Sequence, residues 1–242
     1  MGLKPIPEAD WLQPDPDIAT RKAAFAADPT RITLLPGIEE PERELADMLG
    51  IQGGLAECAQ AHWEDMCLLV RDGDTDFYKL VGAAVAFPTG WDHNDRMGMR
   101  MAQMHAHIHG YTEQLASGVD HFMAKLEAGP IFGRANWFVA PTGDLNWRVE
   151  PPEMAFAHVT PENAGETLFV RSERQTLRRL PETQAILFTI GVYVEALGAL
   201  PAQSVDWLSN AVQAIPPGER ERRGIGAYLP ALIGYADAQK GN

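Results

Sequence analysis

The stretch MCLLVRDGDTDFYKLVGAAVAFP, residues 66–88, predicts the centre of a β-sheet. Two short apolar runs flank the segment DGDTD, and the Gly and Asp residues of that segment favour a turn. Each run has the length of a strand rather than of a helix. We therefore expect an antiparallel hairpin here, against which the rest of the chain packs.

Three more runs rich in aromatic and β-branched residues predict strands further along the chain. They are ANWFVAP at 135–141, ETLFVRS at 166–172 and AILFTIGVYV at 185–194. Between the last two, SERQTLRRL at 172–180 predicts a short helix, because Ser172 and Gln175 match a capping box and Pro181 forbids continuation.

A helical block separates the hairpin from the later strands. Met97, Met101, Met104 and His105 follow one helical stripe through about residue 108, and residues 115–126 repeat the spacing after a break at Gly110. Helices are also expected near both ends of the chain. They are IATRKAAFAA at 18–27, PERELADMLG at 41–50 with Gly50 as its stop, VDWLSNAVQAI at 205–215 and GIGAYLPALIGYA at 224–236.

This order predicts an α+β fold with an antiparallel five-stranded sheet and a helical block on one face. PAS-like domains have this order of elements. We expect an N-terminal helical cover at 1–60, a PAS-like core at 61–200 and C-terminal helices at 201–242 packed on the core, all as one folding unit.

Composition excludes several classes of protein. A net charge of −13 across 242 residues opposes binding to nucleic acid or to an anionic membrane surface. The sequence contains no apolar run of membrane-spanning length and no apolar signal core, so we expect a cytoplasmic protein. Cys58 and Cys67 are too few for a disulfide framework or a four-thiolate cluster and are expected to be buried and reduced.

The segment MHAHIHGY, residues 104–111, places histidines at 105, 107 and 109. In a strand, the three imidazoles would share one face and could bind zinc. In a helix, only His105 and His109 would share a face, and His105 on its methionine-rich stripe would suit an axial haem ligand. A third alternative is that these histidines are ordinary structural or surface residues.

Four arginines, at 171, 174, 178 and 179, lie within nine residues of an otherwise acidic chain. They fit a solvated helix face with intrahelical ion pairs. Alternatively, residues 171–174 form a strand-to-helix junction whose guanidinium groups and free N–H groups bind carboxylates.

Several segments resemble the haem-dependent oxidative N-demethylase alpha-subunit family, over about residues 40–200. The matching segments are VGAAVAFPTGWDHNDRMG at 81–98, the histidine of MHAHIHGY, VDHF at 119–122, GPIFGRANW at 129–137 and VRSERQTLRRLPETQAILFTI at 170–190. The resemblance implies a PAS-type fold that binds haem b, with dioxygen and a small secondary amine such as dimethylamine as substrates. Residues 107–109 replace the usual proline-valine-proline run of the family, and Arg96 replaces its usual lysine.

The resemblance implies roles for individual residues. His105 matches the family histidine and would be the axial ligand of the haem iron. Glu173 would bind the ammonium group of the substrate. The remaining expected site residues are cationic or pocket-lining: Arg134, Arg171 and Arg174 for haem propionates or for negative charge that develops on oxygen, and Asn136 and Trp137 for the shape of the pocket.

The implied reaction is a monooxygenase-type oxidative N-demethylation that needs electrons from elsewhere. The chain has no glycine fingerprint for a dinucleotide, so a separate reductase with FMN and an iron–sulfur cluster is the expected partner. Two other classes of function stay open: a haem-based gas or redox sensor without turnover, and a zinc-binding or haem-free scaffold.

Overall fold

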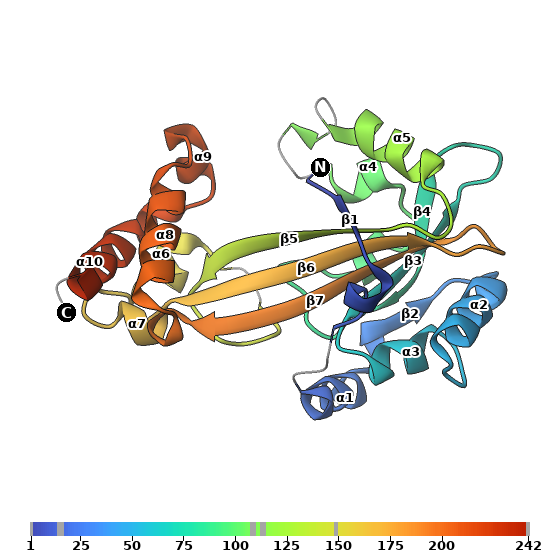
Figure 1. Ribbon diagram of the computed structural model, residues 1–242, viewed down its shortest axis with the longest axis horizontal. Coiled ribbons are helices and arrows are strands. Elements are labelled where there is room, and N and C mark those ends of the chain that lie inside the picture. The colour runs from blue at the N-terminus through green and yellow to red at the C-terminus, as the bar shows by residue number, and fades with distance from the viewer. Residues whose placement is uncertain (1, 14–16, 107–109, 112–114, 148–149, 241–242) are drawn as a thin grey trace. The chain divides into compact units, whose positions relative to one another are not determined.

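The computed structural model describes residues 2–13, 17–106, 110–111, 115–147 and 150–240. The chain divides into two compact units, one formed by Met1–Asn136 with Glu173–Val192 and the other by Trp137–Ser172 with Tyr193–Asn242 (Figure 1). Over the described ranges, no helix is both long and apolar enough to cross a membrane.

The described residues contain a seven-stranded sheet in the order β1-β5-β6-β7-β3-β4-β2. Its strands are β1 (Lys4–Ile6), β2 (Ile32–Leu34), β3 (Asp65–Arg71), β4 (Tyr78–Ala84), β5 (Ile131–Ala140), β6 (Phe169–Arg179) and β7 (Ile186–Ala196). β3 pairs antiparallel with both β4 and β7. The hairpin predicted from residues 66–88 is therefore confirmed, and it lies inside the sheet.

The prediction of five strands is wrong, because β1 and β2 add one strand at each edge of the sheet. β1 pairs antiparallel with β5, and β2 pairs antiparallel with β4. Each added strand has only three residues, which is too short for the alternation of polar and apolar residues that identifies a strand in a sequence. Long-range backbone pairing, rather than local pattern, creates both strands.

The predicted helix at 172–180 is also wrong, because β6 continues as a strand to Arg179. Arg171, Glu173 and Gln175 are buried at alternate positions, as expected for one face of a strand. β6 lies between β5 and β7, whose backbones supply hydrogen-bond partners on both sides. That pairing outweighs the local capping signature, so residues 171–174 do not form a strand-to-helix junction.

Three helices cover one face of the sheet in the first unit (Figure 1): α1 (Ile18–Ala27), α2 (Glu39–Leu49) and α3 (Leu55–Ala61). The helices predicted at 18–27 and 41–50 are confirmed, and Gly50 ends α2 in the left-handed conformation with φ of +66°. Close packing against the sheet needs Gly82, because a Cβ atom there would lie 2.2 Å from Ile38 Cδ1.

A β-bulge in the hairpin decides which residues face the opposite side of the sheet. Leu68 pairs with Gly82 whereas Leu69 pairs with Leu80, so Val81 is the extra residue. The bulge brings Leu80 onto the same face as Ala83, opposite Leu69, which shares the face of Cys67 by ordinary alternation. On that face, these residues pack in clusters that include methionines and aromatic residues of the following segments.

The segments that cover this second face are α4 (Met101–Met104) and α5 (Ser117–Lys125) (Figure 1). The first helix is much shorter than predicted. Gly98 N–H donates to the Leu80 carbonyl and Leu80 N–H donates to the Met99 carbonyl, so residues 97–100 lie along β4 instead of in a helix. The helix predicted in the second half of the block is confirmed as α5. Residues 107–109, which were predicted either to continue this helical block or to form a strand, lie outside the described residues.

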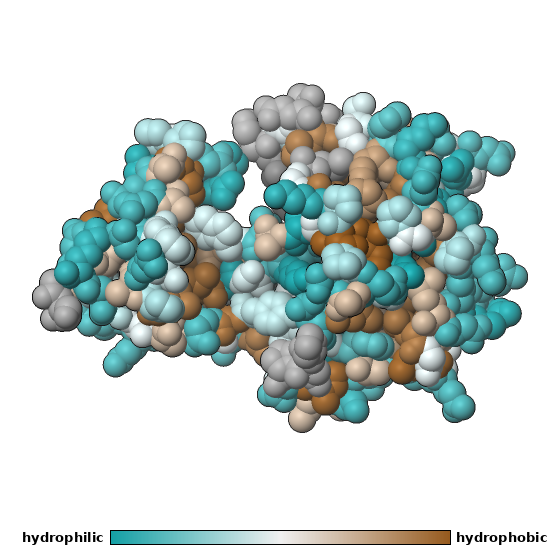
Figure 2. Space-filling model, viewed as in Figure 1, coloured by the Kyte–Doolittle hydropathy of each residue, from teal (hydrophilic) through white to brown (hydrophobic). Residues whose placement is uncertain are grey.

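The second unit has its own apolar core, which includes Phe156, Leu168, Val205, Tyr228 and Leu232. Its helices are α6 (Pro152–Ala155), α7 (Ala164–Thr167), α8 (Ala202–Gln213), α9 (Pro217–Arg222) and α10 (Leu229–Lys240). α8 and α10 confirm the two C-terminal helices predicted from periodicity, although their ends are shifted by several residues. Figure 2 shows predominantly hydrophilic residues on the helices of this unit in the view drawn.

Both cysteines are buried free thiols, as predicted. Burial raises the pKa of the Cys58 thiol to about 11, and burial also raises the pKa of Cys67. Thiolate is the reactive form of cysteine, so neither residue is suited to nucleophilic chemistry or to metal binding at neutral pH.

Candidate functional site

The candidate site lies on the face of the sheet that α4 and α5 cover. An apolar cluster on this face joins sheet residues to Met101 and Met104 of α4 and to Val119 and Phe122 of α5. The sheet contributes Leu69, Phe132, Leu177, Ile186 and Phe188 to this cluster. The helices and the sheet therefore pack apolar side chains against each other on this face.

His105 lies at the C-terminal end of α4, where it is half-buried. Its Nδ1 atom is 2.9 Å from the carbonyl oxygen of Met101. A carbonyl oxygen can only accept, so Nδ1 carries the proton and donates it. In the neutral ring, Nε2 is then the nitrogen with the electron pair, which is the form that binds a metal ion.

Tyr111 stacks on His105, with ring centroids 4.7 Å apart and an angle of 15° between the ring planes. Tyr111 is only 5% exposed, and its hydroxyl has no hydrogen-bond partner among the described residues. Burial, with a smaller contribution from Asp120, raises the pKa of Tyr111 to about 12. The hydroxyl is therefore a protonated donor at neutral pH.

A chain of hydrogen bonds crosses the sheet on the same face. Arg134 Nε donates to Gln175 Oε1 at 2.7 Å, and Gln175 Nε2 donates to Glu173 Oε2 at 3.1 Å. Thr89 Oγ1, in the loop after β4, donates to the other carboxylate oxygen of Glu173 at 2.5 Å. Glu173 is 8% exposed, and these donors hold its buried carboxylate in one orientation.

Two of the predicted site residues are thereby brought together, because Arg134 and Glu173 share Gln175 as a partner. Residues 173, 175 and 177 alternate along β6 and therefore share one face. This face is the one toward α5, because Leu177 packs in the same cluster as residues of α5. His105 lies on the helix that covers the same face.

Arg174 points to the opposite face of β6, as the alternation of a strand requires. Its guanidinium donates to the carbonyl oxygen of Trp11 at 2.8 Å and to that of Asp10. Arg178 lies on the same face, where it forms an ion pair with Glu8 and stacks over the ring of Trp11. These two arginines therefore hold the N-terminal segment against the sheet.

Arg171, Asn136 and Trp137 lie near the points where the chain passes between the two units. Arg171 belongs to the second unit and donates to the carbonyl oxygen of Asp144 at 3.2 Å. Asn136 ends a segment of the first unit and is exposed, whereas Trp137 begins a segment of the second and is 42% exposed.

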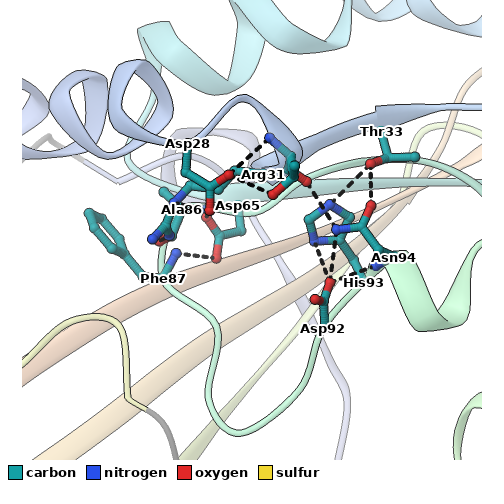
Figure 3. Close-up of polar contacts among 10 residues, drawn as sticks. Asp28, Arg31, Thr33, Asp65, Ala86, Phe87, Asp92, His93 and Asn94 are labelled. Carbon is teal, nitrogen blue, oxygen red and sulfur yellow. Dashed lines mark hydrogen bonds and ion pairs between the residues drawn. The ribbon is translucent and has the colours of Figure 1, made fainter.

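The loop that carries Thr89 is anchored by a group of polar residues shown in Figure 3. Asp65 accepts hydrogen bonds from the backbone N–H groups of Ala86 and Phe87, at 2.7 and 3.3 Å. Further along the loop, Asn94 donates to the carbonyl oxygen of Thr30 and accepts from the Thr33 hydroxyl. Both ends of the segment that holds Thr89 are therefore tied to neighbouring elements.

His93 belongs to the same anchoring group and is 4% exposed. Burial lowers its pKa, and this effect outweighs the opposing effects of Asp92, Thr30, Asp65 and Asp28. The folded protein therefore holds His93 neutral, with its ring within 3.5 Å of the Thr33 hydroxyl (Figure 3).

His93 predicts a loss of stability in weak acid. Because its folded pKa lies below its unfolded value of 6.5, the unfolded chain binds more protons as pH falls below 6.5. The free energy of unfolding should be fully retained above that value and should fall as pH decreases through the folded pKa. Urea titrations between pH 7.5 and about 5 should show a shallower decline for His93→Gln than for the wild type. Equal slopes would contradict the assignment.

Sequence reasoning missed Tyr111, Gln175 and Thr89. Gln175 was interpreted as part of a helix cap, and the error about β6 concealed its place beside Glu173. Tyr111 and Thr89 have no motif of their own, although both lie inside or beside segments that carried the family resemblance.

Two further features bear on ligand binding. Within the described ranges, no group of three or more His, Cys, Asp or Glu side chains could hold a metal ion. A cavity of about 160 Å³ lies at the end of α5, lined by Phe122, Lys125, Leu126, Glu127, Pro130 and Phe132. It is smaller than the ~300 Å³ from which sites for organic ligands usually begin, so it is not a site for a porphyrin.

A comparison with known protein families finds one match that covers most of the chain. Residues 51–232 match the family described as haem-dependent oxidative N-demethylase, alpha subunit-like. The matched range includes His105, Tyr111, Thr89 and the whole of β6, so the candidate site lies within it. The chain therefore belongs to the haem-dependent oxidative N-demethylase alpha subunit-like family.

Proposed function

We propose that this protein is a haem-dependent monooxygenase that removes a methyl group from a small secondary amine such as dimethylamine. The observation that carries the proposal is that the range matched by the family contains both His105 and Glu173. His105 has the tautomer that binds a metal ion, and Glu173 provides a buried carboxylate on the face of the sheet that the helix of His105 covers. A sheet with α4 and α5 on this face also agrees with the PAS-like arrangement implied by the resemblance.

The residues of the site suit haem b. His105 offers an imidazole whose Nδ1 proton is directed at a backbone carbonyl, and Met101, Met104 and Phe122 offer apolar surface near it. The buried hydroxyl of Tyr111 lacks an acceptor among the described residues, and a carboxylate of a bound group would supply one. His105 would hold the iron. Arg134, which shares Gln175 as a partner with Glu173, remains the proposed propionate-binding or charge-stabilising residue. The prediction for Arg174 is withdrawn, because this residue points to the opposite face of β6 and is bonded to the N-terminal segment.

Glu173 would bind the substrate through its ammonium group. A dialkylamine is protonated at neutral pH, and a buried carboxylate provides both charge and direction for its N–H groups. Thr89 and Gln175 each occupy one oxygen of Glu173. An ionised carboxylate accepts about four hydrogen bonds in total, so further acceptor positions stay available for the amine. The same carboxylate would receive the ammonium proton when the free amine is needed.

Haem, when bound, would supply the redox chemistry that oxidises the N-methyl group with dioxygen. Dimethylamine, dioxygen, two electrons and two protons balance to methylamine, formaldehyde and water. The electrons would come from a separate reductase carrying FMN and an iron–sulfur cluster, which is consistent with the alpha-subunit name of the family. We propose a cytoplasmic location for this assembly.

Spectra and metal analysis of the purified protein test the proposal. A Soret band, an amine-induced shift of that band and release of formaldehyde with a chemical reductant are the expected results. A Soret band without amine shifts or formaldehyde, across a series of secondary amines, would favour a sensor. Stoichiometric zinc without a Soret band would favour the zinc-binding alternative and overturn the proposal.

Replacement of Glu173 tests the amine site. Glu173→Gln keeps the shape of the side chain and removes its charge, so the dissociation constant for dimethylamine should rise about 10- to 100-fold, as expected for loss of a charge-assisted hydrogen bond. Haem content should stay unchanged. Titration of the amine-induced spectral shift measures the constant, with the exposed residue Glu153 changed to Gln as the control. An unchanged dissociation constant for Glu173→Gln would exclude this role.

A further inference from the structure

The orientation of His105 is restrained by two different contacts. The first is the hydrogen bond from Nδ1 to the Met101 carbonyl, one helical turn earlier. The second is the ring of Tyr111, which covers one face of the imidazole almost parallel to it. The hydrogen bond restrains the direction of Nδ1, whereas the stack restrains the plane of the ring.

His62 makes the same kind of hydrogen bond as His105 but has no described stacked ring. It lies at the C-terminal end of α3, as His105 does at the end of α4. Its Nδ1 atom is also 2.9 Å from a carbonyl oxygen four residues earlier, that of Cys58. Both rings are half-buried. The described ring contacts include a stacked aromatic partner for His105, and none for His62. The two residues therefore form a matched pair that differs in the aromatic ring.

We propose that Tyr111 is a positioning residue that holds the imidazole plane of His105 and thereby keeps its proton on Nδ1. The Nδ1 hydrogen bond is directional and weakens steeply when the ring rotates. A flat side chain packed on the imidazole opposes that rotation at little further entropic cost, because the ring of Tyr111 is itself ordered by burial. Packing of an aromatic pair in this geometry adds about 0.5–1.5 kcal/mol beyond the burial of area.

The burial of Tyr111 makes this restraint rigid. The side chain is 5% exposed, so it cannot swing into solvent without opening its surroundings. Its hydroxyl makes no hydrogen bond within the described ranges, so its described contact with His105 is through the ring. A phenylalanine would preserve that contact, and an aliphatic residue would not.

The inference rests on the proposed function only in naming His105 as the haem ligand. Its first test therefore uses protein without haem. Long-range ¹H–¹⁵N spectra of ¹⁵N-histidine-labelled protein at neutral pH report which nitrogen of each ring carries the proton. Assignments come from His105→Ala and His62→Ala. The wild type should show His105 with its proton on Nδ1.

Substitutions of Tyr111 then separate ring, hydroxyl and volume. Tyr111→Leu and Tyr111→Met should shift His105 toward the tautomer protonated at Nε2, whereas Tyr111→Phe should keep the wild-type tautomer. His62 should be unchanged in all three variants. Tyr111→Met is included in case Tyr111→Leu does not fold, because the flexible methionine side chain adapts to the space that it fills. Retention of the Nδ1 proton in both aliphatic variants would overturn the inference, as would a shift in Tyr111→Phe.

The second test adds haem to the same variants. Tyr111→Leu and Tyr111→Met should weaken haem binding about tenfold or more, the usual scale for losing an outer residue that orients a metal ligand. Tyr111→Phe should lose less than the aliphatic variants, because it keeps the ring on His105 and gives up only the hydroxyl proposed to donate to a haem carboxylate. Unchanged haem affinity in the aliphatic variants would overturn the role in ligand positioning. If the wild type binds no haem while the tautomer still depends on Tyr111, the proposed function fails and the orientation of His105 by Tyr111 stands.

Discussion

His105→Ala should purify without a Soret band and should fail to take up added haem. If His105 holds the iron as proposed, its removal deletes that bond, so haem affinity should fall by more than the ~100-fold upper range seen for outer residues. The neighbouring apolar side chains of α4 and α5 would then bind haem only by non-specific contact. Absorption titration of the purified protein with haemin measures the loss.

His62→Ala is the matched control for this experiment. His62 has the same position at a helix end and the same Nδ1 contact with a backbone carbonyl as His105. Its removal should leave haem content and spectrum unchanged. Addition of free imidazole to His105→Ala should restore part of the binding, since the cavity left by the side chain can accept the ring. Normal haem content in His105→Ala would reject the assignment of this residue as the ligand.

Arg21→Met should destabilise the protein by about 3–5 kcal/mol, the range for removing one partner of a buried ion pair. Arg21 is fully buried on α1 and donates to Asp65 Oδ1 at 2.8 Å. It also donates to the carbonyl oxygens of Ala59 and Glu64, both at 2.6 Å. Methionine fills the space but leaves a buried carboxylate and two buried carbonyl oxygens without this donor.

Urea denaturation followed by tryptophan fluorescence measures the loss. Lys22→Met, at the exposed neighbouring position of α1, is the control and should change the free energy of unfolding by less than ~0.5 kcal/mol. The double variant Arg21→Met, Asp65→Asn should lose less than the two single losses added, because it removes the uncompensated charge. A loss below ~1 kcal/mol for Arg21→Met would show that the pair contributes little to stability.

The same ion pair connects stability to the candidate site. Asp65 accepts from the N–H groups of Ala86 and Phe87, which begin the loop that carries Thr89. Thr89 in turn donates to Glu173. Arg21→Met should therefore weaken dimethylamine binding as well, even though Arg21 itself lies outside the site.

Local pattern was sufficient where a segment is long and uniform. The hairpin at 66–88, α1, α2, α5, α8 and α10 were predicted from apolar runs, turn residues and helical spacing, and all of them form. These segments satisfy their backbone groups with near neighbours in sequence, or with a partner across a short turn. The family resemblance likewise rested on contiguous segments, and the family match confirms it.

Local pattern was misleading at β6. Ser172 and Gln175 have the spacing of a helix cap. However, the backbone of 169–179 pairs on one side with β5, which ends at Ala140, and on the other with β7, the next strand in the sequence. The change from helix to strand alters the site, because a strand places Glu173 and Arg174 on opposite faces, whereas a helix would have separated them by only about 100°. Arg174 is bonded to the N-terminal segment, whereas Glu173 faces α4 and α5.

By itself, the sequence determined the class of the fold, the central hairpin, the helices at both ends, the buried thiols and the family, because each is encoded by neighbouring residues. Only the tertiary structure decided the edge strands, the length of α4 and the side-chain partners of the site. Thr89, Glu173 and His105 come from three separate segments, and Tyr111 reaches His105 across the break after α4. Such contacts depend on which face each strand residue takes, and one bulge at Val81 or one change from helix to strand alters that face.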